Sequence, residues 1–369
     1  EKKTETETKV ETEPVDPPAP KSGSNIMMFI FGAIAAAALC MIGILLRLLF
    51  KGNSEKADRQ PVQQPGPRAD GQNIAQPMDY DEERTVNPDT ASAAPAAAPV
   101  AAKPVKSKLT VNAAVANHKG RVRGNNEDNF CFQGIYMERS KMDNGILLAE
   151  TKKEPVQMYA VCDGMGGADC GEEASCRAAG ELAARKQNYA GLMDRNYLTS
   201  TLREISDAVY NDAVQRGQKS GTTVAMMVMQ GKQVVFANVG DSRVYRLRDG
   251  VLEQISVDHS KVQRMINMGV LTPEQARTDP SRHVITQYMG MPSDIRISPY
   301  IVENQEVRVN DIYLLCSDGL TDMVEDKQIE AIMNGKKNVK ETVRELVETA
   351  LRNGGKDNVT VMLVEITRV

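Results

Sequence analysis

The sequence has no tryptophan, only 4% aromatic residues and no excess of positive charge. Its formal net charge of −4 argues against a nucleic-acid-binding protein, because such proteins usually carry a basic patch. The three histidines, His118, His259 and His283, form no ligand cluster of the kind that holds zinc. The overall composition, 41% hydrophobic, is that of a globular protein with additional polar segments.

The six cysteines lack the paired spacing of a disulfide framework. Cys40 lies inside an apolar stretch, which leaves an odd number of cysteines in the rest of the chain. We therefore expect reduced thiols and a reducing compartment. The chain opens on Glu1 rather than on a methionine, which leaves open whether further residues precede it.

The first 106 residues contain three segments with little or nothing to build a soluble core. Residues 1–25 are rich in glutamate, threonine, proline and lysine, and this composition predicts a disordered acidic tail. Residues 26–50 include an uncharged run of 21 residues, from Ile26 to Leu46, which is long enough to span a bilayer. Residues 51–106 hold eight prolines and predict a flexible linker.

Other interpretations of residues 26–50 are weaker. A buried core helix would have nothing to pack against between two disordered flanks. A cleaved signal peptide would not follow an acidic approach of 25 residues. Lipid attachment at Cys40 is disfavoured because the preceding residue, Leu39, is large and the apolar run continues beyond the cysteine. A single retained transmembrane helix is the prediction.

Positive charge is concentrated after this helix. Four basic residues follow the uncharged run Ile26–Leu46 within about 15 positions, whereas Lys21 is nearly alone before it. The four residues are Arg47, Lys51, Lys56 and Arg59. By the positive-inside rule the C-terminal part lies in the cytoplasm, so we expect a single-pass protein of the cell membrane.

Residues 107–369 have the pattern of one packed domain. Short apolar strands joined by Gly-Lys and Asp-Gly turns alternate with amphipathic helices, which predicts an α+β domain built on antiparallel sheet. The pattern of segment 222–255 predicts one meander of consecutive hairpins. The predicted strands are 109–116, 128–136, 158–162, 222–229, 233–239, 243–248, 251–255, 311–316 and 359–366, and the predicted helices are 171–187, 197–216 and 339–351.

Three distant stretches each place an aspartate close to a glycine near a predicted strand: Val161–Gly167, Cys316–Asp322 and Gly355–Asn358. We expect Asp163 to lie in a turn where the following glycines supply positive φ and allow close approach of a ligand. A carboxylate beside a bare carbonyl suits a hard divalent cation. Taken alone, an Asp-Gly pair is more often an ordinary turn, but its recurrence after apolar strands weakens that explanation.

Seven motifs in a fixed order resemble the metal-dependent serine/threonine protein phosphatases of the protein phosphatase 2C type. They are Arg-x-x-Asn-Glu-Asp (123–128), Asp-Gly-Met-Gly-Gly (163–167), Gly-Thr-Thr (221–223), Gly-Asp-Ser-Arg (240–243), Asp-His-Ser (258–260), Ser-Asp-Gly-Leu-Thr-Asp (317–322) and Asp-Asn-Val-Thr (357–360). The resemblance covers about 109–369 and nothing before it. It implies two antiparallel sheets packed as a sandwich, with helices on both outer faces.

The resemblance also implies roles for individual residues. Two Mn²⁺ or Mg²⁺ ions would be held by Asp163, the carbonyl of Gly164, Asp318 and Asp357, and a weaker third ion by Asp241 and Asp322. Arg123, Glu127 and Asp128 match the catalytic motif, with Arg123 as the clamp for substrate phosphate and Glu127 acting through water on the metals. Oxygen ligands select Mg²⁺ or Mn²⁺ over zinc, which agrees with this assignment.

The implied activity is hydrolysis of phosphoserine and phosphothreonine in proteins, opposing a serine/threonine kinase at the cytoplasmic membrane face. No cysteine is followed six residues later by an arginine, which excludes a cysteine-dependent phosphatase. Some animal members have a proton-donating histidine where this chain has Met165, and a thioether cannot donate a proton. The general acid stays open, with water on a metal as our expectation. Single histidines usually have structural roles, so His259 and His283 are candidates only if the fold brings them in.

The resemblance further implies that 261–285 form a mobile flap beside the site. Two other functions stay open. One is an inactive relative that serves as a binding module, although none of the three core aspartates is lost. The other is a developmental-type relative with one dedicated partner, for which no sensor domain is evident.

Overall fold

The structure, a computed structural model, describes residues 109–166, 170–335 and 337–369. The predicted acidic tail, transmembrane helix and linker, residues 1–106, lie outside the described residues. Among the helices of the described part, none is long and apolar enough to cross a membrane.

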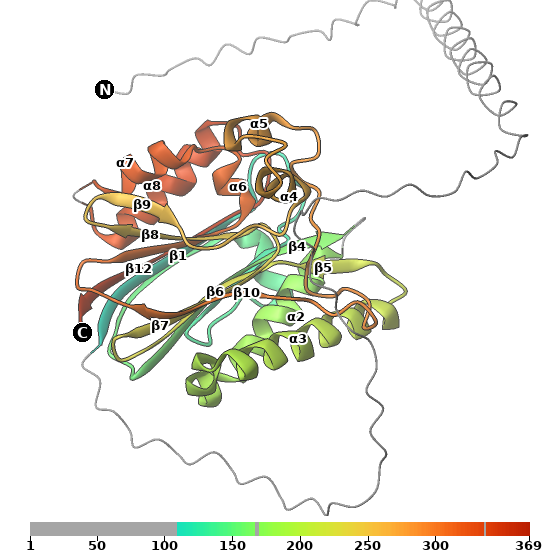
Figure 1. The fold of residues 1–369 in the computed structure, drawn as a ribbon, viewed down its shortest axis with the longest axis horizontal. Helices are drawn as coiled ribbons and strands as arrows, with labels where there is room; N and C mark the ends of the chain where they lie inside the picture. Colours follow the sequence, from blue (N-terminus) through green and yellow to red (C-terminus); the bar gives the residue numbers. More distant parts are fainter. Residues whose placement is uncertain (1–108, 167–169, 336) are drawn as a thin grey trace, which may run out of the picture. The chain divides into compact units, whose positions relative to one another are not determined.

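Two six-stranded antiparallel sheets face each other (Figure 1). The first sheet has the order β3 (Ile146–Lys152), β1 (Thr110–His118), β12 (Val359–Arg368), β11 (Ile312–Cys316), β8 (Arg243–Arg248) and β9 (Val251–Gln254). The second has the order β10 (Tyr300–Glu306), β7 (Gln233–Val239), β6 (Val224–Gln230), β4 (Val156–Gly166) and β2 (Asp128–Phe132), with β5 (Ser220–Thr222) paired to β4.

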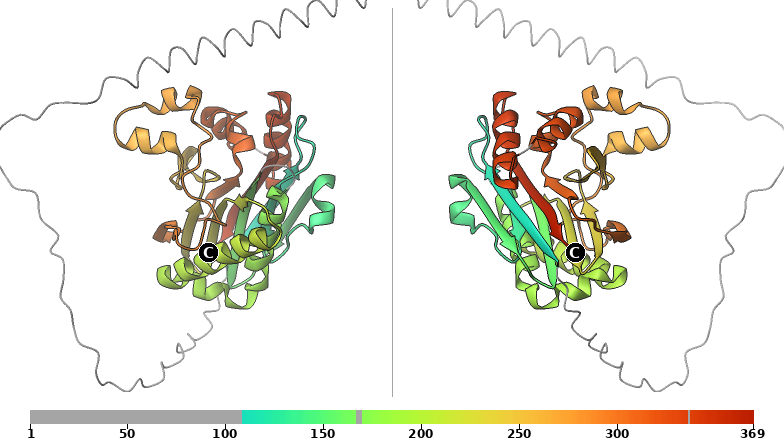
Figure 2. Two further views of the ribbon diagram at one scale, coloured as in Figure 1. Left: turned by 90° about the vertical axis from the view of Figure 1, so that its right-hand side faces the viewer. Right: turned by 90° about the vertical axis from the view of Figure 1, so that its left-hand side faces the viewer.

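Helices cover the outer face of each sheet. The helical elements of the described residues are η1 (Arg139–Asn144), α2 (Gly171–Ala184), η2 (Lys186–Met193), α3 (Arg195–Gln215), α4 (Lys261–Asn267), α5 (Pro273–Thr278), α6 (Asp318–Thr321), α7 (Asp326–Met333) and α8 (Val339–Arg352). α7 and α8 lie over the first sheet, and α2 and α3 lie over the second (Figure 1). α4 and α5 project from one end of the sandwich (Figure 2). The predicted sandwich with helices on both faces is confirmed.

Three hydrophobic layers hold this arrangement together. In β1, Val111, Ala113 and Val115 point into the layer between the sheets, whereas Ala114 and Ala116 pack under the helices. Successive side chains of a strand point to opposite faces, so a strand buried on both faces has a continuous apolar run. This is why most strands of this domain were recognisable from the sequence without an alternating pattern.

The predicted meander is wrong at one point. β6–β7 and β8–β9 are hairpins, but β7 and β8 belong to different sheets, so Gly240–Ser242 crosses from one sheet to the other. A hairpin turn and a crossover can begin with the same Gly-Asp pair, so local sequence did not distinguish them. The crossing places Asp241 between the two sheets.

Several element boundaries also differ from the prediction. The strand expected at 128–136 ends at Phe132, because Gln133 and Gly134 take positive φ values of 53° and 86° and close a tight turn. The helix expected at 171–187 ends at Ala184. β3, β10, α4, α5 and α7 were not predicted. The cap of α8 is as predicted, since Asn338 accepts a hydrogen bond from the backbone N–H of Glu341 at 3.0 Å.

Candidate metal centre

Asp163 does not lie in a turn, contrary to our expectation. β4 continues through it to Gly166 and pairs with β2 and β5 on the way. Gly164 has no positive φ. A Cβ atom at that position would lie 2.2 Å from the carbonyl oxygen of Gly171 and 2.4 Å from that of Glu127. Glycine is required here because two other backbone segments approach the strand.

Hydroxyl groups fix the backbone of Asp163. Its N–H donates to Oγ1 of Thr223 at 3.0 Å, and its carbonyl accepts from Oγ1 of Thr222 at 2.8 Å. Thr223 Oγ1 in turn lies 2.6 Å from Oγ of Ser242, in the crossover between the sheets. The Gly-Thr-Thr and Gly-Asp-Ser-Arg motifs therefore share one hydrogen-bond network, which positions the Asp163 carboxylate.

Asp128 is the deepest carboxylate of the site. It lies opposite Asp163 in the β2–β4 pairing and is 1% exposed. Its Oδ2 accepts hydrogen bonds from Oγ of Ser317 and Oγ1 of Thr360, both at 2.7 Å, but its Oδ1 has no partner among the described residues. Burial raises the pKa of Asp128 to about 7, with further contributions from nearby acidic residues.

Asp318 begins α6 rather than lying in a turn. The N–H of Asp322 donates to its carbonyl at 2.8 Å, so the two aspartates are one helical turn apart. At Gly319 a Cβ atom would lie 1.9 Å from the carbonyl oxygen of Asn358. As at Gly164, the glycine of this Asp-Gly pair allows close packing against a backbone segment that is distant in the sequence.

Asn358 joins two loops of the site. Its Oδ1 accepts from the N–H of Glu127 at 2.8 Å, and its Nδ2 donates to the carbonyl of Asn125 at 2.9 Å. The preceding residue, Asp357, forms an ion pair with Arg123 at 2.7 Å, with about half of the arginine side chain exposed. We did not assign a role to Asn358 from the sequence. The only signal was its place in the Asp-Asn-Val-Thr motif.

Glu127 is buried beside the first turn of α2. Burial raises its pKa, and the neighbouring Glu172 raises it further. Hydrogen bonds from Asn125 and from the backbone of Gly171 act in the opposite direction. Glu172 is fully buried and forms an ion pair with Arg139. The Glu127 carboxyl group thus holds a proton more readily than an exposed glutamate does.

The carboxylates converge from different elements. Burial raises the pKa of Asp163 strongly, and the charges of Asp128, Asp318, Asp241 and Asp357 raise it further. The pKa of Asp241 is likewise raised by burial and then by Asp318. So many negative charges in one place require positive charge to ionise together. The unpartnered oxygen of Asp128 and the all-oxygen ligand set fit hard divalent cations such as Mg²⁺ or Mn²⁺.

The fold brings one histidine to these aspartates. His283 lies 3.8 Å from Oδ2 of Asp318 and 3.5 Å from Oδ2 of Asp322, and its pKa is raised, chiefly by its interaction with Asp318. His283 therefore meets the condition set from the sequence, that the fold brings it to the site, and it stays a candidate. His259 instead accepts a hydrogen bond at Nδ1 from the N–H of Gly240 at 3.2 Å.

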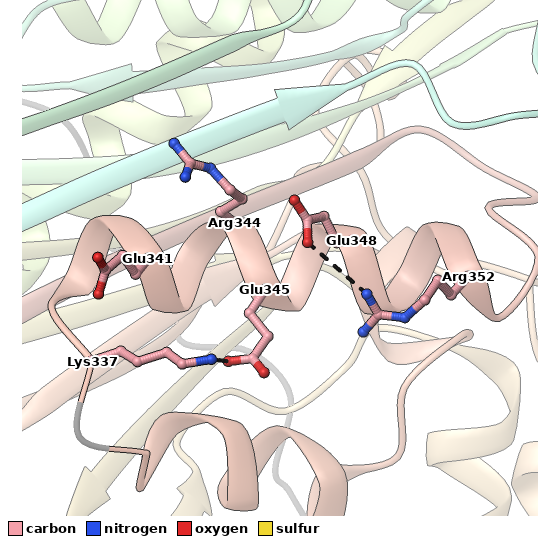
Figure 3. A pocket seen from close by; sticks show the side chains of 6 residues that line it. All are labelled: Lys337, Glu341, Arg344, Glu345, Glu348 and Arg352. Carbon is pink, nitrogen blue, oxygen red and sulfur yellow. Dashed lines mark hydrogen bonds and ion pairs between the residues drawn. The ribbon is translucent and has the colours of Figure 1, made fainter.

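A separate hollow of about 410 Å³ lies on α8 (Figure 3). Its lining side chains are Lys337, Glu341, Arg344, Glu345, Glu348 and Arg352. Lys337 pairs with Glu345 at 2.8 Å and Arg352 with Glu348 at 3.9 Å. Ion pairs that are partly or fully exposed contribute little to the stability of the fold. None of these residues belongs to the carboxylate cluster. The hollow is the solvated face of an amphipathic helix.

Comparison with known proteins agrees with this geometry. The profile of the family described as protein phosphatase 2C matches residues 126–264. The serine/threonine phosphatase stp of Listeria innocua is 32% identical over 253 residues, which cover 67% of this chain and 92% of that protein. The chain belongs to the protein phosphatase 2C family.

Solved structures of bacterial phosphatases have the same fold as this phosphatase. That of the Mycobacterium tuberculosis serine/threonine phosphatase PstP/Ppp has a TM-score of 0.60 and 32% identity, covering 70% of this chain and all of that one. The catalytic domain of PstP in complex with two manganese ions has a TM-score of 0.57 and 30% identity, with the same coverage. The chain is thus a metal-dependent protein serine/threonine phosphatase.

Proposed function

We propose that this phosphatase hydrolyses phosphoserine and phosphothreonine in proteins at a dinuclear Mn²⁺ or Mg²⁺ centre held by Asp163, the Gly164 carbonyl, Asp318 and Asp357. The observation that carries the proposal is the convergence of these carboxylates around the buried Asp128, whose Oδ1 has no hydrogen-bond partner among the described residues. Cations bound there would lower the pKa of a water molecule and neutralise phosphoryl oxygens.

Arg123 is the proposed phosphate clamp. Its guanidinium is half-exposed and held at the edge of the site by Asp357. An arginine fork can bind two phosphoryl oxygens at once. Because the pair with Asp357 uses only part of this hydrogen-bonding capacity, substrate can bind without displacing the arginine from the site.

Glu127 is the proposed proton acceptor for the attacking water. Its pKa is raised by burial, which makes it a better proton acceptor than an exposed glutamate. Asp128 is the proposed positioning residue beneath the centre, because its Oδ2 is held by two hydroxyl groups while Oδ1 stays available. Asp241 and Asp322, with Asp318, would form an outer site for a third cation.

Manganese-dependent release of phosphate by residues 107–369 tests this assignment. We expect turnover of p-nitrophenyl phosphate and of phosphoserine and phosphothreonine peptides in Mn²⁺, and none in excess chelator. Asp163→Asn is the matched inactive variant, since it keeps the size of the side chain and removes the charge. A wild-type domain that binds phosphopeptides without releasing phosphate would instead support the binding-module function.

We further propose that the enzyme opposes a serine/threonine kinase at the cytoplasmic face of a membrane. The uncharged run from Ile26 to Leu46 and the basic residues that follow it support this location. Such an anchor followed by a flexible linker would restrict the phosphatase to substrates near the membrane.

A further inference from the structure

One flap side chain reaches the proposed metal centre. His283 follows α4 and α5 in the chain, and its two ring nitrogens lie 3.8 Å from Asp318 and 3.5 Å from Asp322. One potential ligand atom from each of the three residues lies within 4.8 Å of the others. In an octahedral site with bonds near 2.1 Å, ligand atoms lie about 3 Å apart when adjacent and about 4.2 Å when opposite. The separations of 3.8 and 3.5 Å lie between these two values but start from different ring nitrogens. Binding of one ion by a single nitrogen would therefore need the three groups, which lie within 4.8 Å of one another, to move slightly closer together.

The backbone around His283 is tied down on both sides of the flap. The N–H of Lys261 donates to the carbonyl of Val284 at 2.8 Å, and the N–H of Thr286 donates to the carbonyl of His259 at 2.7 Å. From α5, Arg277 donates to the carbonyl of Thr321, next to Asp322, at 3.4 Å. The flap is therefore docked on α6 in this structure, and His283 is held over its two aspartates.

We propose that His283 is a ligand of the cation in the outer site, together with Asp318 and Asp322. This inference rests on the proposed metal centre and adds a nitrogen ligand to a site otherwise made of oxygen. One ring nitrogen would bind the ion, and the N–H of the other would donate to a carboxylate, an arrangement typical of metal-bound histidine.

Two consequences follow from an imidazole ligand. Nitrogen suits Mn²⁺ and later transition metals better than Mg²⁺, so the outer site should discriminate between these ions although the core sites need not. Because His283 belongs to the flap and the aspartates belong to α6, a bound ion would also hold the flap against the metal centre.

The competing role for His283 is that of a protonated counter-ion for the two aspartates. The two roles predict opposite effects of its removal. Loss of a ligand weakens cation binding, whereas loss of a nearby positive charge strengthens it. The sign of the change in affinity therefore decides between them.

The test is Mn²⁺ titration of the purified full chain, with free Mn²⁺ followed by its electron paramagnetic resonance signal. At saturation, electron spin echo modulation from ¹⁴N reports a nitrogen ligand, since the proposed core ligands are all oxygen. We expect ¹⁴N modulation in the wild type and its loss in His283→Ala. We also expect the weakest Mn²⁺ site to bind at least about tenfold more weakly in that variant, with little change for Mg²⁺.

Arg282→Ala is the control, because this exposed neighbour changes the charge of the flap without offering a ligand. It should keep the ¹⁴N modulation and bind the third ion as tightly as, or more tightly than, the wild type. The inference is wrong if His283→Ala binds the third Mn²⁺ as tightly as, or more tightly than, the wild type. It is also wrong if the wild type gives no nitrogen signal. In both cases the two tightly bound ions and phosphate release would remain. Absence of any tight Mn²⁺ site would instead overturn the proposed function.

Discussion

Without metal, the carboxylates of the centre should make the domain less stable as the pH rises. Asp128 is the clearest case, because burial raises its pKa to about 7 whereas the unfolded value is about 3.9. Between these two values the folded state holds a proton that the unfolded chain has released. Stability contributed by this proton is present at pH 4 and lost by about pH 7.

The magnitude follows from the two pKa values. Their difference corresponds to about 4 kcal/mol, at about 1.4 kcal/mol for each pH unit. For a domain of this size, 1 kcal/mol changes the melting temperature by about 2–4 °C. About 3 kcal/mol of this difference is lost between pH 4.5 and pH 7.5, so the metal-free domain should lose roughly 6–12 °C over this range from this group. The raised pKa values of Asp163 and Asp241 act in the same direction.

The assay is thermal unfolding of residues 107–369 in chelator across this pH range. Asp128→Asn should flatten the profile, because the amide can still accept from Ser317 and Thr360 but has no proton to lose. Asp249→Asn, in an exposed turn, is the control and should leave the profile unchanged. Saturating Mn²⁺ should remove the loss of stability at high pH, since the ion supplies the missing charge. A metal-free profile that rises with pH would refute this account of the site.

Other perturbations separate the remaining roles. Asp163→Asn or Asp318→Asn should abolish turnover while the domain stays folded and melts at an equal or higher temperature in chelator; unfolding would contradict this. Asp322→Ala should keep two ions in a crystal and lower turnover, and loss of both ions would show that the division into core and outer ligands is wrong. Arg123→Ala should raise KM by roughly 10- to 150-fold, about 1.5–3 kcal/mol for charged hydrogen bonds, with lysine restoring it only partly and Arg121→Ala near neutral. Equal kinetics for the two alanine variants would exclude Arg123 as the clamp. Protease added to intact cells should leave the catalytic domain uncut, and its digestion would reverse the proposed membrane orientation.

The sequence motifs predicted acidic residues that the fold brings near one another, but they did not predict the local conformation of these residues. Asp163 was expected in a turn because Asp-Gly is a common turn pair. It instead lies in a strand, and Asp318, which also precedes a glycine, begins a helix. Gly164 is required by the approach of Glu127 and Gly171, and Gly319 by the approach of Asn358; Glu127 and Asn358 are distant from these glycines in the sequence. A rule based on neighbouring residues cannot detect such contacts.

Strand prediction failed mainly at the edges of the sheets. β10 lies at the edge of its sheet, and its residues Tyr300, Asn304 and Glu306 are exposed or only partly buried, so the segment lacks an apolar run. β3 is likewise an edge strand, with three apolar residues followed by mostly polar ones. The central strands were predicted because helices cover their outer face. Both faces of these strands are therefore buried, and their sequences are apolar runs.

The least predictable feature is the position of His283. His283 lies near the end of the flap, more than twenty residues after β9, and nothing in its local sequence indicates which element it will contact. Its place beside Asp318 and Asp322 depends on the bridge between Ser260 and Ile285, which closes the flap at its base. The aspartates of the centre are fixed by buried strands and hydroxyl networks, whereas this histidine is fixed by a docked and partly exposed segment. We therefore expect variation at the flap to change the proposed outer site while the proposed core centre stays intact.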